Sequence, residues 1–440
     1  MTTKNSYQNL IQEFDKALEN LPDYRTGENT VYEIKDAALG AFAMFFMQSP
    51  SFLSYQRTLK KKKGRSNAET LFGIEKIPSN NQIRNLLDPQ NPEALSPVFA
   101  TGFQELEREG KIESYRSYQD NLLISCDGTN FFSSKKIHCE KCSRTELENG
   151  ETNYSHSGIL PLIAKPGENR VIHLEPEFIV PQDGHEKQDC EREGMKRWLR
   201  KHGEHYSAYG GTILGDDLYC NQVMCENILD AGFDFILVCK PDSHKALYEM
   251  IDFLEANGGV EEVTVRSWNG RFVEIYTYRF VNQVPIRRGE DALLVNWCEL
   301  TITKEEDGKV LYKNAFATNF QITEENVRDI VRDGRTRWKS ENEGNNNLKT
   351  KGYHLEHNFG HGKEYLANFL LTLNLLAYLF HTVLAFLDDK YKKIREELVR
   401  RDTFFNDLRA LTRYMVFDSW SHLLRFMMIG LELIPGAEFP

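Results

Sequence analysis

The sequence predicts an α/β fold in which a mixed sheet carries helices on both faces. Two observations predict it. Short apolar runs end at acidic or turn residues, and from the third run onward helical segments alternate with these runs. Helices layered on a sheet bury both faces of such strands. With 440 residues, of which 40% are hydrophobic and 27% charged, the chain is long enough for two or three domains with a sizeable core.

The first part of the core is expected between residues 117 and 257. Its element order is strand, strand, strand, helix, strand, helix, strand, which is the order of a ribonuclease-H-like core. Pro166-Gly167, between the second and third strands, predicts a hairpin. The expected strands are residues 121–126, 158–165, 170–180, 211–215 and 233–239, and the expected helices are residues 189–202, 221–231 and 244–254.

The rest of the chain divides into four further regions. Residues 1–116 are expected to be a helical N-terminal domain that binds DNA or, alternatively, caps the core, with helices at 36–47 and 80–87 around a basic loop at 60–65. A β-rich insertion at 258–322, with strands at 272–281, 293–303 and 310–318, splits the core. The second core part is expected at 323–388, and a C-terminal helical region with a helix at 420–433 follows at 389–440.

The net charge of -11 argues mildly against a nucleic-acid partner, because DNA repels an acidic surface. The basic residues are clustered, however, and a cluster can bind phosphate locally, although most such runs are solvated faces. The three clusters are Arg57 with Lys60, Lys61, Lys62, Lys63 and Arg65; Arg332 with Arg335, Arg337 and Lys339; and Lys390 with Lys392, Lys393, Arg395, Arg400 and Arg401.

Eight cysteines in a chain of this length do not make a disulfide framework, and the first ten residues are polar. We therefore expect reduced thiols and a cytoplasmic protein. Residues 366–387 are apolar enough to resemble a membrane span, but they include Asn368, Asn374 and His381. A buried helix of a large core is the favoured interpretation, and no membrane partner is expected.

Three acidic residues are the candidate catalytic and metal-binding groups. Asp127 and Asp216 each follow a predicted buried strand, and side chains at such strand ends converge on one crevice. Glu341 lies on a predicted helix, where Arg337 shares its face and can pair with it. Lys349 is eight residues beyond Glu341, about 80° round an α-helix. Taken singly, each Asp would more often have a turn or capping role. Together, the carboxylates suit two Mg²⁺ or Mn²⁺ ions.

At these motifs the chain resembles DDE transposases of the IS4-like insertion-sequence superfamily. The resemblance covers about residues 121–387, and its three motifs occur in the family's order. The residues that carry it are Cys126-Asp127-Gly128-Thr129, Leu214-Gly215-Asp216-Asp217-Leu218-Tyr219, and Arg337-Trp338-Lys339-Ser340-Glu341 followed by Leu348-Lys349.

The resemblance selects Asp127, Asp216 and Glu341 as the acids. Two departures from the family pattern leave competitors. Six residues usually separate the family's Glu and Lys, whereas seven separate Glu341 from Lys349 and five separate Glu343 from it. The family's Tyr three residues before the Arg is replaced by Gly334. Glu343 is therefore the runner-up for the third acid, and Asp217 is the runner-up for the second.

The implied function is DNA transposition, with binding of terminal inverted repeats, metal-dependent cleavage and 3′-hydroxyl strand transfer into target DNA by a homodimer. Arg337 and Lys349 would hold phosphate. Lys61, Lys62, Lys63 and Arg65 are further DNA-binding candidates. The alternatives are a nuclease or resolvase of the same fold without strand transfer, and a domesticated, non-catalytic DNA-binding protein.

A separate candidate site is a zinc site in the loop at 133–156, with His138, Cys139, Cys142 and His156 as ligands. Cys-x2-Cys with two histidines nearby has zinc-ligand spacing, although one such pair is only half of a signature. The alternative is a surface loop with reduced thiols. The histidine-rich segment at 353–362 could also supply metal ligands or DNA contacts, with His354 and His357 three residues apart.

Overall fold

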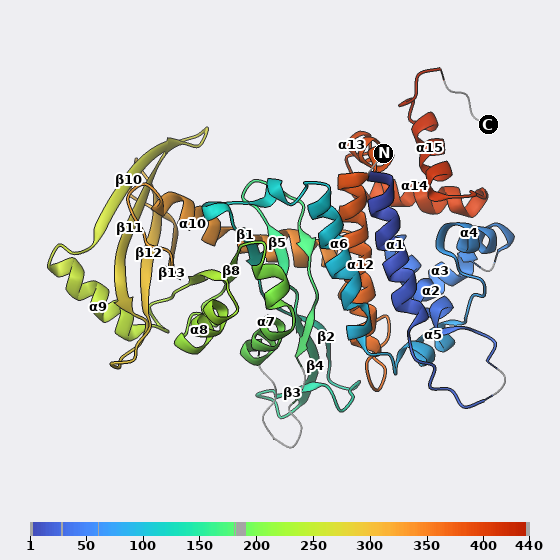
Figure 1. Cartoon of the computed structure of the whole chain (residues 1–440), viewed down its shortest axis with the longest axis horizontal. Coiled ribbons are helices and arrows are strands. Elements are labelled where there is room, and N and C mark those ends of the chain that lie inside the picture. The colour runs from blue at the N-terminus through green and yellow to red at the C-terminus, as the bar shows by residue number, and fades with distance from the viewer. Residues whose placement is uncertain (1–2, 28–29, 60, 180, 182–190, 437–440) are drawn as a thin grey trace.

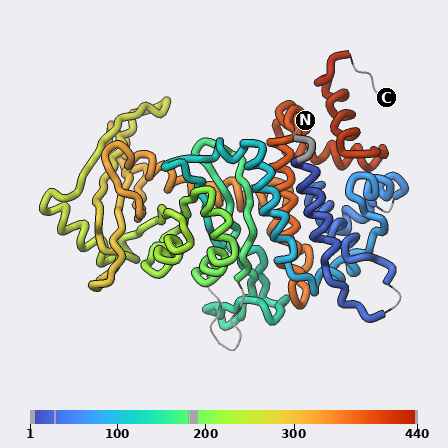
Figure 2. Tube along the Cα trace, viewed as in Figure 1, coloured from blue at the N-terminus to red at the C-terminus, as the bar shows by residue number. Residues whose placement is uncertain are grey.

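A computed structural model describes residues 3–27, 30–59, 61–179, 181 and 191–436, and every structural statement below concerns these residues. The molecule is elongated (Figure 1). A sheet occupies one end and the middle, and a bundle of helices occupies the other end, where the two chain termini also lie (Figure 2). The predicted α/β class with a mixed sheet is confirmed.

The main sheet has nine strands in the order β10-β11-β12-β13-β9-β8-β1-β5-β6. β8 is parallel to both β1 and β9, and the other neighbouring pairs are antiparallel. The strands are β1 (Leu122–Ser125), β5 (Leu162–Ala164), β6 (Ile172–His173), β8 (Gly211–Gly215), β9 (Asp234–Val238), β10 (Glu261–Trp268), β11 (Val273–Pro285), β12 (Leu294–Lys304) and β13 (Val310–Thr318).

The predicted hairpin at Pro166-Gly167 is confirmed, because β5 and β6 pair antiparallel on either side of it. The two strands predicted around it were wrong in length. Each is broken near a proline, Pro161 in the first and Pro176 in the second, where no N–H is available for a ladder. The residues before Pro161 belong to β4 (Thr152–Ile159), and those after Pro176 belong to β7 (Glu177–Ile179). These two strands pair with each other in a second sheet. Val180 lies outside the described residues.

The second sheet contains β2 (Gly128–Ser134), β3 (Ser143–Glu146), β4 and β7, with β4 paired to the other three. It begins at the residue after Asp127, so it extends directly from the end of β1. The segment at 133–156, expected as a loop, therefore includes the end of β2, all of β3 and most of β4, with loops between them.

The region expected as a β-rich insertion continues the main sheet, because β13 pairs with β9. Three of its four strands match the predicted ones. β10 was not predicted, because its residues are mostly polar and both of its faces are largely exposed. Val263 and Val265 share one face but are only half-buried, and two apolar positions are too short an alternation to predict a strand.

Alternate residues of the central strands contribute to two separate hydrophobic clusters. Leu123, Leu214 and Ile236 face α10 (Val327–Arg335), while Ile124 and Ile213 face the larger cluster on the opposite side. That side is covered by α7 (Glu191–Ser207), α8 (Gln222–Asp230) and α9 (Lys245–Ala256). The sheet is thus a layer between helices, as an α/β fold requires.

The helical end is built around α12 (Leu366–Leu387), which contacts helices from both ends of the chain (Figure 1). Of its most apolar 18-residue window, 89% is buried inside the protein, which is the environment of a core helix. The other helices are α1 (Thr3–Glu19), α2 (Ile34–Phe46), α3 (Phe52–Leu59), α4 (Lys62–Phe72), α5 (Asn80–Leu87), α6 (Ser96–Arg108), α13 (Asp389–Glu397), α14 (Arg401–Tyr414) and α15 (Trp420–Gly430).

Two predictions for the basic clusters are corrected. The expected loop at 60–65 is short, because α4 already begins at Lys62, so Lys62, Lys63 and Arg65 are helical. In the C-terminal cluster Arg401 does not lie on a solvated face. Its guanidinium stacks 4.8 Å from the centre of the Tyr353 ring.

Candidate functional site

Asp127 and Asp216 emerge together from the carboxyl ends of two adjacent parallel strands. β1 and β8 are in register, with Ser125 opposite Leu214, and the backbone N–H of Cys126 extends the ladder by donating to Leu214. Asp127 follows one residue later, and Asp216 is the first residue after β8. Neighbouring strands lie about 4.8 Å apart, so both carboxylates leave the same edge of the sheet.

Glu341 reaches this edge from a helix that is fastened to β1. The helix comprises the π-helical segment Ser340–Asn345 and α11 (Asn346–Thr350), and we call it the third-acid helix. Ser340 Oγ donates to Ser125 Oγ (2.6 Å), which in turn donates to the carbonyl of Arg337 (3.3 Å). This contact joins the residue before Glu341 to a residue two before Asp127.

The charges of these residues act on one another. The pKa of Asp127 is raised to about 6, chiefly by burial and also by the carboxylates of Glu191, Asp216 and Glu341, while the Arg337 guanidinium acts to lower it. The site is thus a cluster of carboxylates with one neutralising guanidinium. Within the described residues no ion pair joins Arg337 to Glu341. Glu341 instead accepts a hydrogen bond from the indole of Trp338 (3.1 Å).

The carboxylate oxygens of Asp127, Asp216 and Glu341 do not all lie within 4.8 Å of one another, so they do not form a closed ligand set for one ion. A pair of ions can be held by carboxylates that lie farther apart than the ligands of a single ion. With ions about 4 Å apart and Mg–O bonds of about 2.1 Å, carboxylates on opposite sides are separated by up to about 8 Å.

Glu191 is a neighbour of Asp127 that the sequence did not single out. It accepts hydrogen bonds from the backbone N–H of Gly128 (3.1 Å) and from the Tyr219 hydroxyl (2.7 Å), which follow the first and second acids respectively. A Cβ at Gly128 would lie 2.1 Å from the Glu191 carboxylate, which explains the glycine after Asp127. Its sequence signal was a place in the first turn of the helix expected at 189–202; Asp189, where that helix was expected to begin, lies outside the described residues.

The two runner-up acids have other partners. Asp217 accepts a hydrogen bond from the backbone N–H of Lys240 (2.6 Å) and lies 3.2 Å from His244 Nε2. Glu343 lies 4.0 Å from Lys339.

The π-helical segment changes the angle between Glu341 and Lys349. A π-helical turn takes up one residue more than an α-helical turn. The eight residues from Glu341 to Lys349 therefore behave like seven residues of α-helix. The angle between the two side chains around the helix axis falls from about 80° to about 20°. Lys349 itself lies 3.7 Å from Glu356. Gly334, at the position of the family's tyrosine, packs where a Cβ would lie 2.9 Å from both Ile236 and Phe316.

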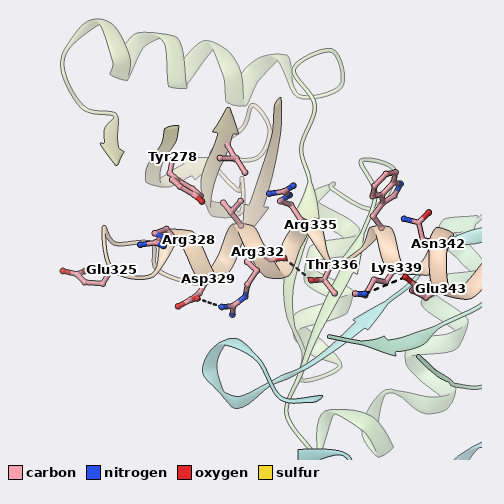
Figure 3. Close-up of a pocket in the computed structure, with 13 residues that line it drawn as sticks. Tyr278, Glu325, Arg328, Asp329, Arg332, Arg335, Thr336, Lys339, Asn342 and Glu343 are labelled. Atoms are coloured by element: carbon pink, nitrogen blue, oxygen red, sulfur yellow. Dashed lines mark hydrogen bonds and ion pairs between the residues drawn. The ribbon is translucent and has the colours of Figure 1, made fainter. Parts of the chain in front are cut away.

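A groove of about 680 Å³ runs along α10 towards the third-acid helix (Figure 3). Its side chains carry charges of both signs. Arg332 is paired with Asp329 (2.7 Å), and Arg335 stacks on Tyr312. The charged and aromatic residues that line it are Tyr278, Glu325, Arg328, Asp329, Arg332, Arg335, Trp338, Lys339 and Glu343.

The other DNA-binding candidates lie elsewhere. Lys61, Lys62, Lys63 and Arg65 are at α4, in the helical end of the molecule, and α1, α6 and α12 separate them from β1 and β8 (Figure 1). The structure does not bring this cluster to the acidic site.

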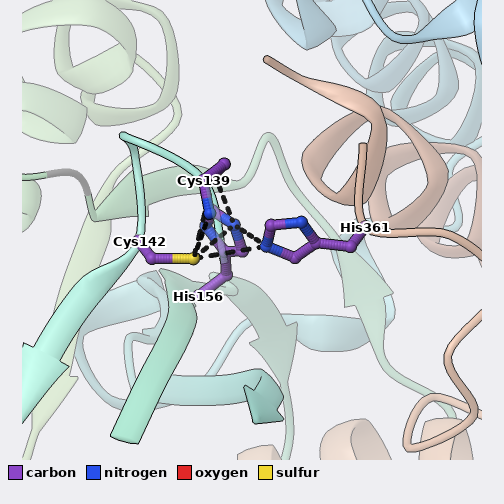
Figure 4. Close-up of side chains that lie close together, drawn as sticks. All are labelled: Cys139, Cys142, His156 and His361. Atoms are coloured by element: carbon purple, nitrogen blue, oxygen red, sulfur yellow. Dashed lines mark hydrogen bonds between the residues drawn. The ribbon is translucent and has the colours of Figure 1, made fainter. Parts of the chain in front are cut away.

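A Cys/His group forms a compact cluster that can hold a metal ion (Figure 4). Cys139, Cys142 and His156 belong to it as expected. The fourth member is His361, not the predicted His138, whose exposed ring stacks on Tyr154. His361 is 219 residues beyond Cys142, so no local spacing could reveal it.

A second group, Cys220, Cys239 and His244, follows the second acid motif and is buried. Its three ligand atoms also lie within 4.8 Å of one another. Asp217 contacts its histidine, which ties this group to the loop after β8.

The amino-acid sequence was compared with family models and with curated proteins. No protein-family model matches the chain, and no curated protein matches its sequence at a significant level.

Proposed function

We propose that this protein is a DDE transposase, which cleaves DNA at transposon ends and joins the freed 3′-hydroxyl to target DNA. The observation that carries the proposal is the edge of the main sheet at β1 and β8. Asp127 and Asp216 leave it side by side, and the helix bearing Glu341 is hydrogen-bonded to β1 two residues before Asp127.

The strand order supports a ribonuclease-H-like core. In the stretch β6-β5-β1-β8-β9, the first three strands form an antiparallel meander and the last two run parallel to β1. α7 lies in sequence between the meander and β8, and α8 lies between β8 and β9. This is the sequence-predicted order of strand, strand, strand, helix, strand, helix, strand.

The π-helical segment supports Glu341 as the third acid. It absorbs the one residue by which the chain exceeds the family spacing, so Glu341 and Lys349 share a face despite seven intervening residues. Glu343 has no such relation to Lys349. Gly334 replaces the family's tyrosine because the helix packs against the sheet there without room for a side chain.

The residues at the site fit a pair of Mg²⁺ or Mn²⁺ ions. Asp127, Asp216 and Glu341 would hold them, with Glu191 as an adjacent carboxylate. Bound ions would supply activation of water or a 3′-hydroxyl and stabilisation of the leaving oxygen. Arg337 would orient a phosphate by a bidentate contact, and Lys349 would add a positive charge. The exposed Trp338, hydrogen-bonded to Glu341, presents a ring on which a base can stack.

The groove along α10 is the proposed path of DNA towards the acids, with Arg328, Arg335 and Lys339 as phosphate contacts. The distant cluster on α4 would bind another stretch of the same terminal repeat, or the partner's DNA in a homodimer.

The test is cleavage of DNA carrying the element's terminal repeats in Mg²⁺, with Asp127→Asn, Asp216→Asn, Glu341→Gln and Glu343→Gln. The first three should lose cleavage by at least about 10³-fold while binding the ends normally, because only the ion-bound transition state is affected. Glu343→Gln, the matched control, should stay within about tenfold of wild type. Cleavage that survives Asp127→Asn and Asp216→Asn would refute the site assignment.

A strand-transfer assay with pre-cleaved ends separates this proposal from a nuclease or resolvase of the same fold. A transposase joins the ends to target DNA, and a nuclease leaves them unjoined. End binding without cleavage under all metal conditions would instead support a non-catalytic DNA-binding protein.

A further inference from the structure

We propose that Cys139, Cys142, His156 and His361 form a structural Zn²⁺ site that joins the second sheet to the segment following the third-acid helix. The proposal is independent of transposase activity, since it concerns how the chain is held together.

The ligand atoms have the separations of a tetrahedron around zinc. With Zn–S bonds of about 2.3 Å and Zn–N bonds of about 2.05 Å, tetrahedral angles predict about 3.8 Å between sulfurs, 3.6 Å between sulfur and nitrogen, and 3.3 Å between nitrogens. The two Sγ atoms are 3.8 Å apart, and His156 Nε2 lies 3.5 Å from Cys139 Sγ and 3.4 Å from Cys142 Sγ. His361 Nε2 lies 3.2 Å from Cys142 Sγ and 3.1 Å from His156 Nε2.

Neither a disulfide nor a purely hydrogen-bonded cluster fits this geometry as well as a bound metal does. An Sγ–Sγ distance of 3.8 Å is far from the S–S bond length of about 2.05 Å in a disulfide. All four side chains are buried or nearly so, and their two sulfurs and two ring nitrogens converge on one point (Figure 4). His361 Nδ1 lies 2.8 Å from the carbonyl of Gly362, so its proton is directed there and Nε2 is left as the ligand atom.

Two thiolates and two imidazoles in a closed set of four are typical of structural zinc, since no position remains for substrate. Mg²⁺ prefers oxygen, so this group does not compete for the ions of the acidic site.

The site would add a metal link between two parts of the chain that also meet through ring contacts, with Phe132 4.4 Å from the His361 ring and the Lys141 ammonium 3.0 Å over the Tyr365 ring. Cys139 and Cys142 lie between β2 and β3, and His156 is on β4. His361 belongs to the stretch at 351–365, which has no helix or strand. The hydrogen bonds of that stretch lead to the helical end instead: Arg84 donates to Phe359, and the Asp88 carboxylate accepts from the backbone of residues 363, 364 and 366.

The test measures zinc in the purified full-length chain and in Cys142→Ser, His361→Asn and His138→Ala variants by plasma mass spectrometry. Wild type should carry one zinc per chain more than Cys142→Ser or His361→Asn. His138→Ala, the matched control from the same loop, should retain all of it. Taking the difference cancels any metal held at Cys220, Cys239 and His244.

The proposal is overturned if wild type carries no more zinc than His361→Asn. It is also overturned if His138→Ala loses as much zinc as the ligand variants do. Should the ligand variants fail to fold, a Cys220→Ser, Cys239→Ser variant loaded with Co²⁺ provides the answer, because tetrahedral cobalt with two thiolates absorbs strongly in the visible and the second Cys/His group has lost both of its thiols. Absence of that spectrum would refute the site. Hydrogen exchange should also rise in residues 351–365 after zinc removal and stay unchanged in β8.

Discussion

At the residue scale, side chains at strand ends were predictable and contacts between distant residues were not. Asp127 and Asp216 could be chosen because each follows a short apolar run, and parallel strands deliver such residues to one edge. Glu191 could not, because its role depends on a contact with Gly128 that only the folded chain creates. For His361 the sequence indicated only that its histidine-rich segment could supply metal ligands, and the contact with Cys142 depends on the fold. His138 was chosen wrongly since nearness in sequence was the only criterion.

Glu175 makes stability depend on pH. Burial raises its pKa from 4.5 to about 7, against a hydrogen bond from the Tyr206 hydroxyl (2.7 Å) that lowers it. The folded state therefore favours the protonated acid. The contribution of protonated Glu175 to the free energy of unfolding is fully present below pH 4.5, and it is lost as the pH rises through about 7.

We expect Glu175→Gln, which keeps the neutral shape, to match wild type at pH 4 and to exceed its unfolding free energy at pH 8 by up to about 3 kcal/mol. Urea unfolding across this pH range measures the difference. Glu204→Gln, an exposed change on α7, the helix that carries Tyr206, should leave the pH dependence of wild type intact. If the unfolding free energy changes with pH equally in Glu175→Gln and wild type, Glu175 does not titrate in this range.

At the element scale, apolar alternation located most strands, while backbone irregularities were invisible. β8 and β13 have the predicted bounds; β8 is buried throughout, and the second half of β13 is buried. β10 has no buried face, and the π-helical turn at Ser340–Asn345 leaves no mark in composition. The helix at α5 begins as capping chemistry requires, with Ser79 and Gln82 forming a capping box.

Gly334 tests the packing of α10 on the sheet. A methyl group there would approach Ile236 and Phe316 to 2.9 Å, and overpacking of this kind costs about 1–3 kcal/mol, offset by about 1 kcal/mol of helix propensity. We expect Gly334→Ala to lower the unfolding free energy by about 1 kcal/mol and Gly334→Tyr to prevent folding. Urea unfolding measures the effect of Gly334→Ala, and an unchanged m-value would show that the substitution alters stability alone. Wild-type stability of Gly334→Tyr would contradict the close packing described here.

At the scale of the whole molecule, the chain ends form one helical body that sequence order does not suggest. α2 and α6 pack on α12, and α4 packs on α14. Asn67 on α4 donates to the carbonyls of Thr412 and Met415 and accepts from the backbone of Phe417. Regions 1–116 and 389–440 were predictable as helical, but their union depends on contacts across more than 300 residues.

We expect a fragment of residues 1–116 to remain largely unfolded, because its apolar helix faces are buried by α12 and α14 in the full chain. Circular dichroism and proton NMR would measure its helicity and shift dispersion against the intact protein. A cooperative thermal transition in the isolated fragment would show that these helices fold without the C-terminal ones.

The separation of Cys142 and His361 has a consequence for the order of folding. Between them lie the strands from β3 to β13, so the closed loop spans 219 residues and almost the entire main sheet. Closing so long a loop is unfavourable until the intervening chain has compacted. The fourth ligand therefore reaches the other three only after the sheet has assembled. Binding of a metal by all four ligands would then be a late step that stabilises a sheet already formed.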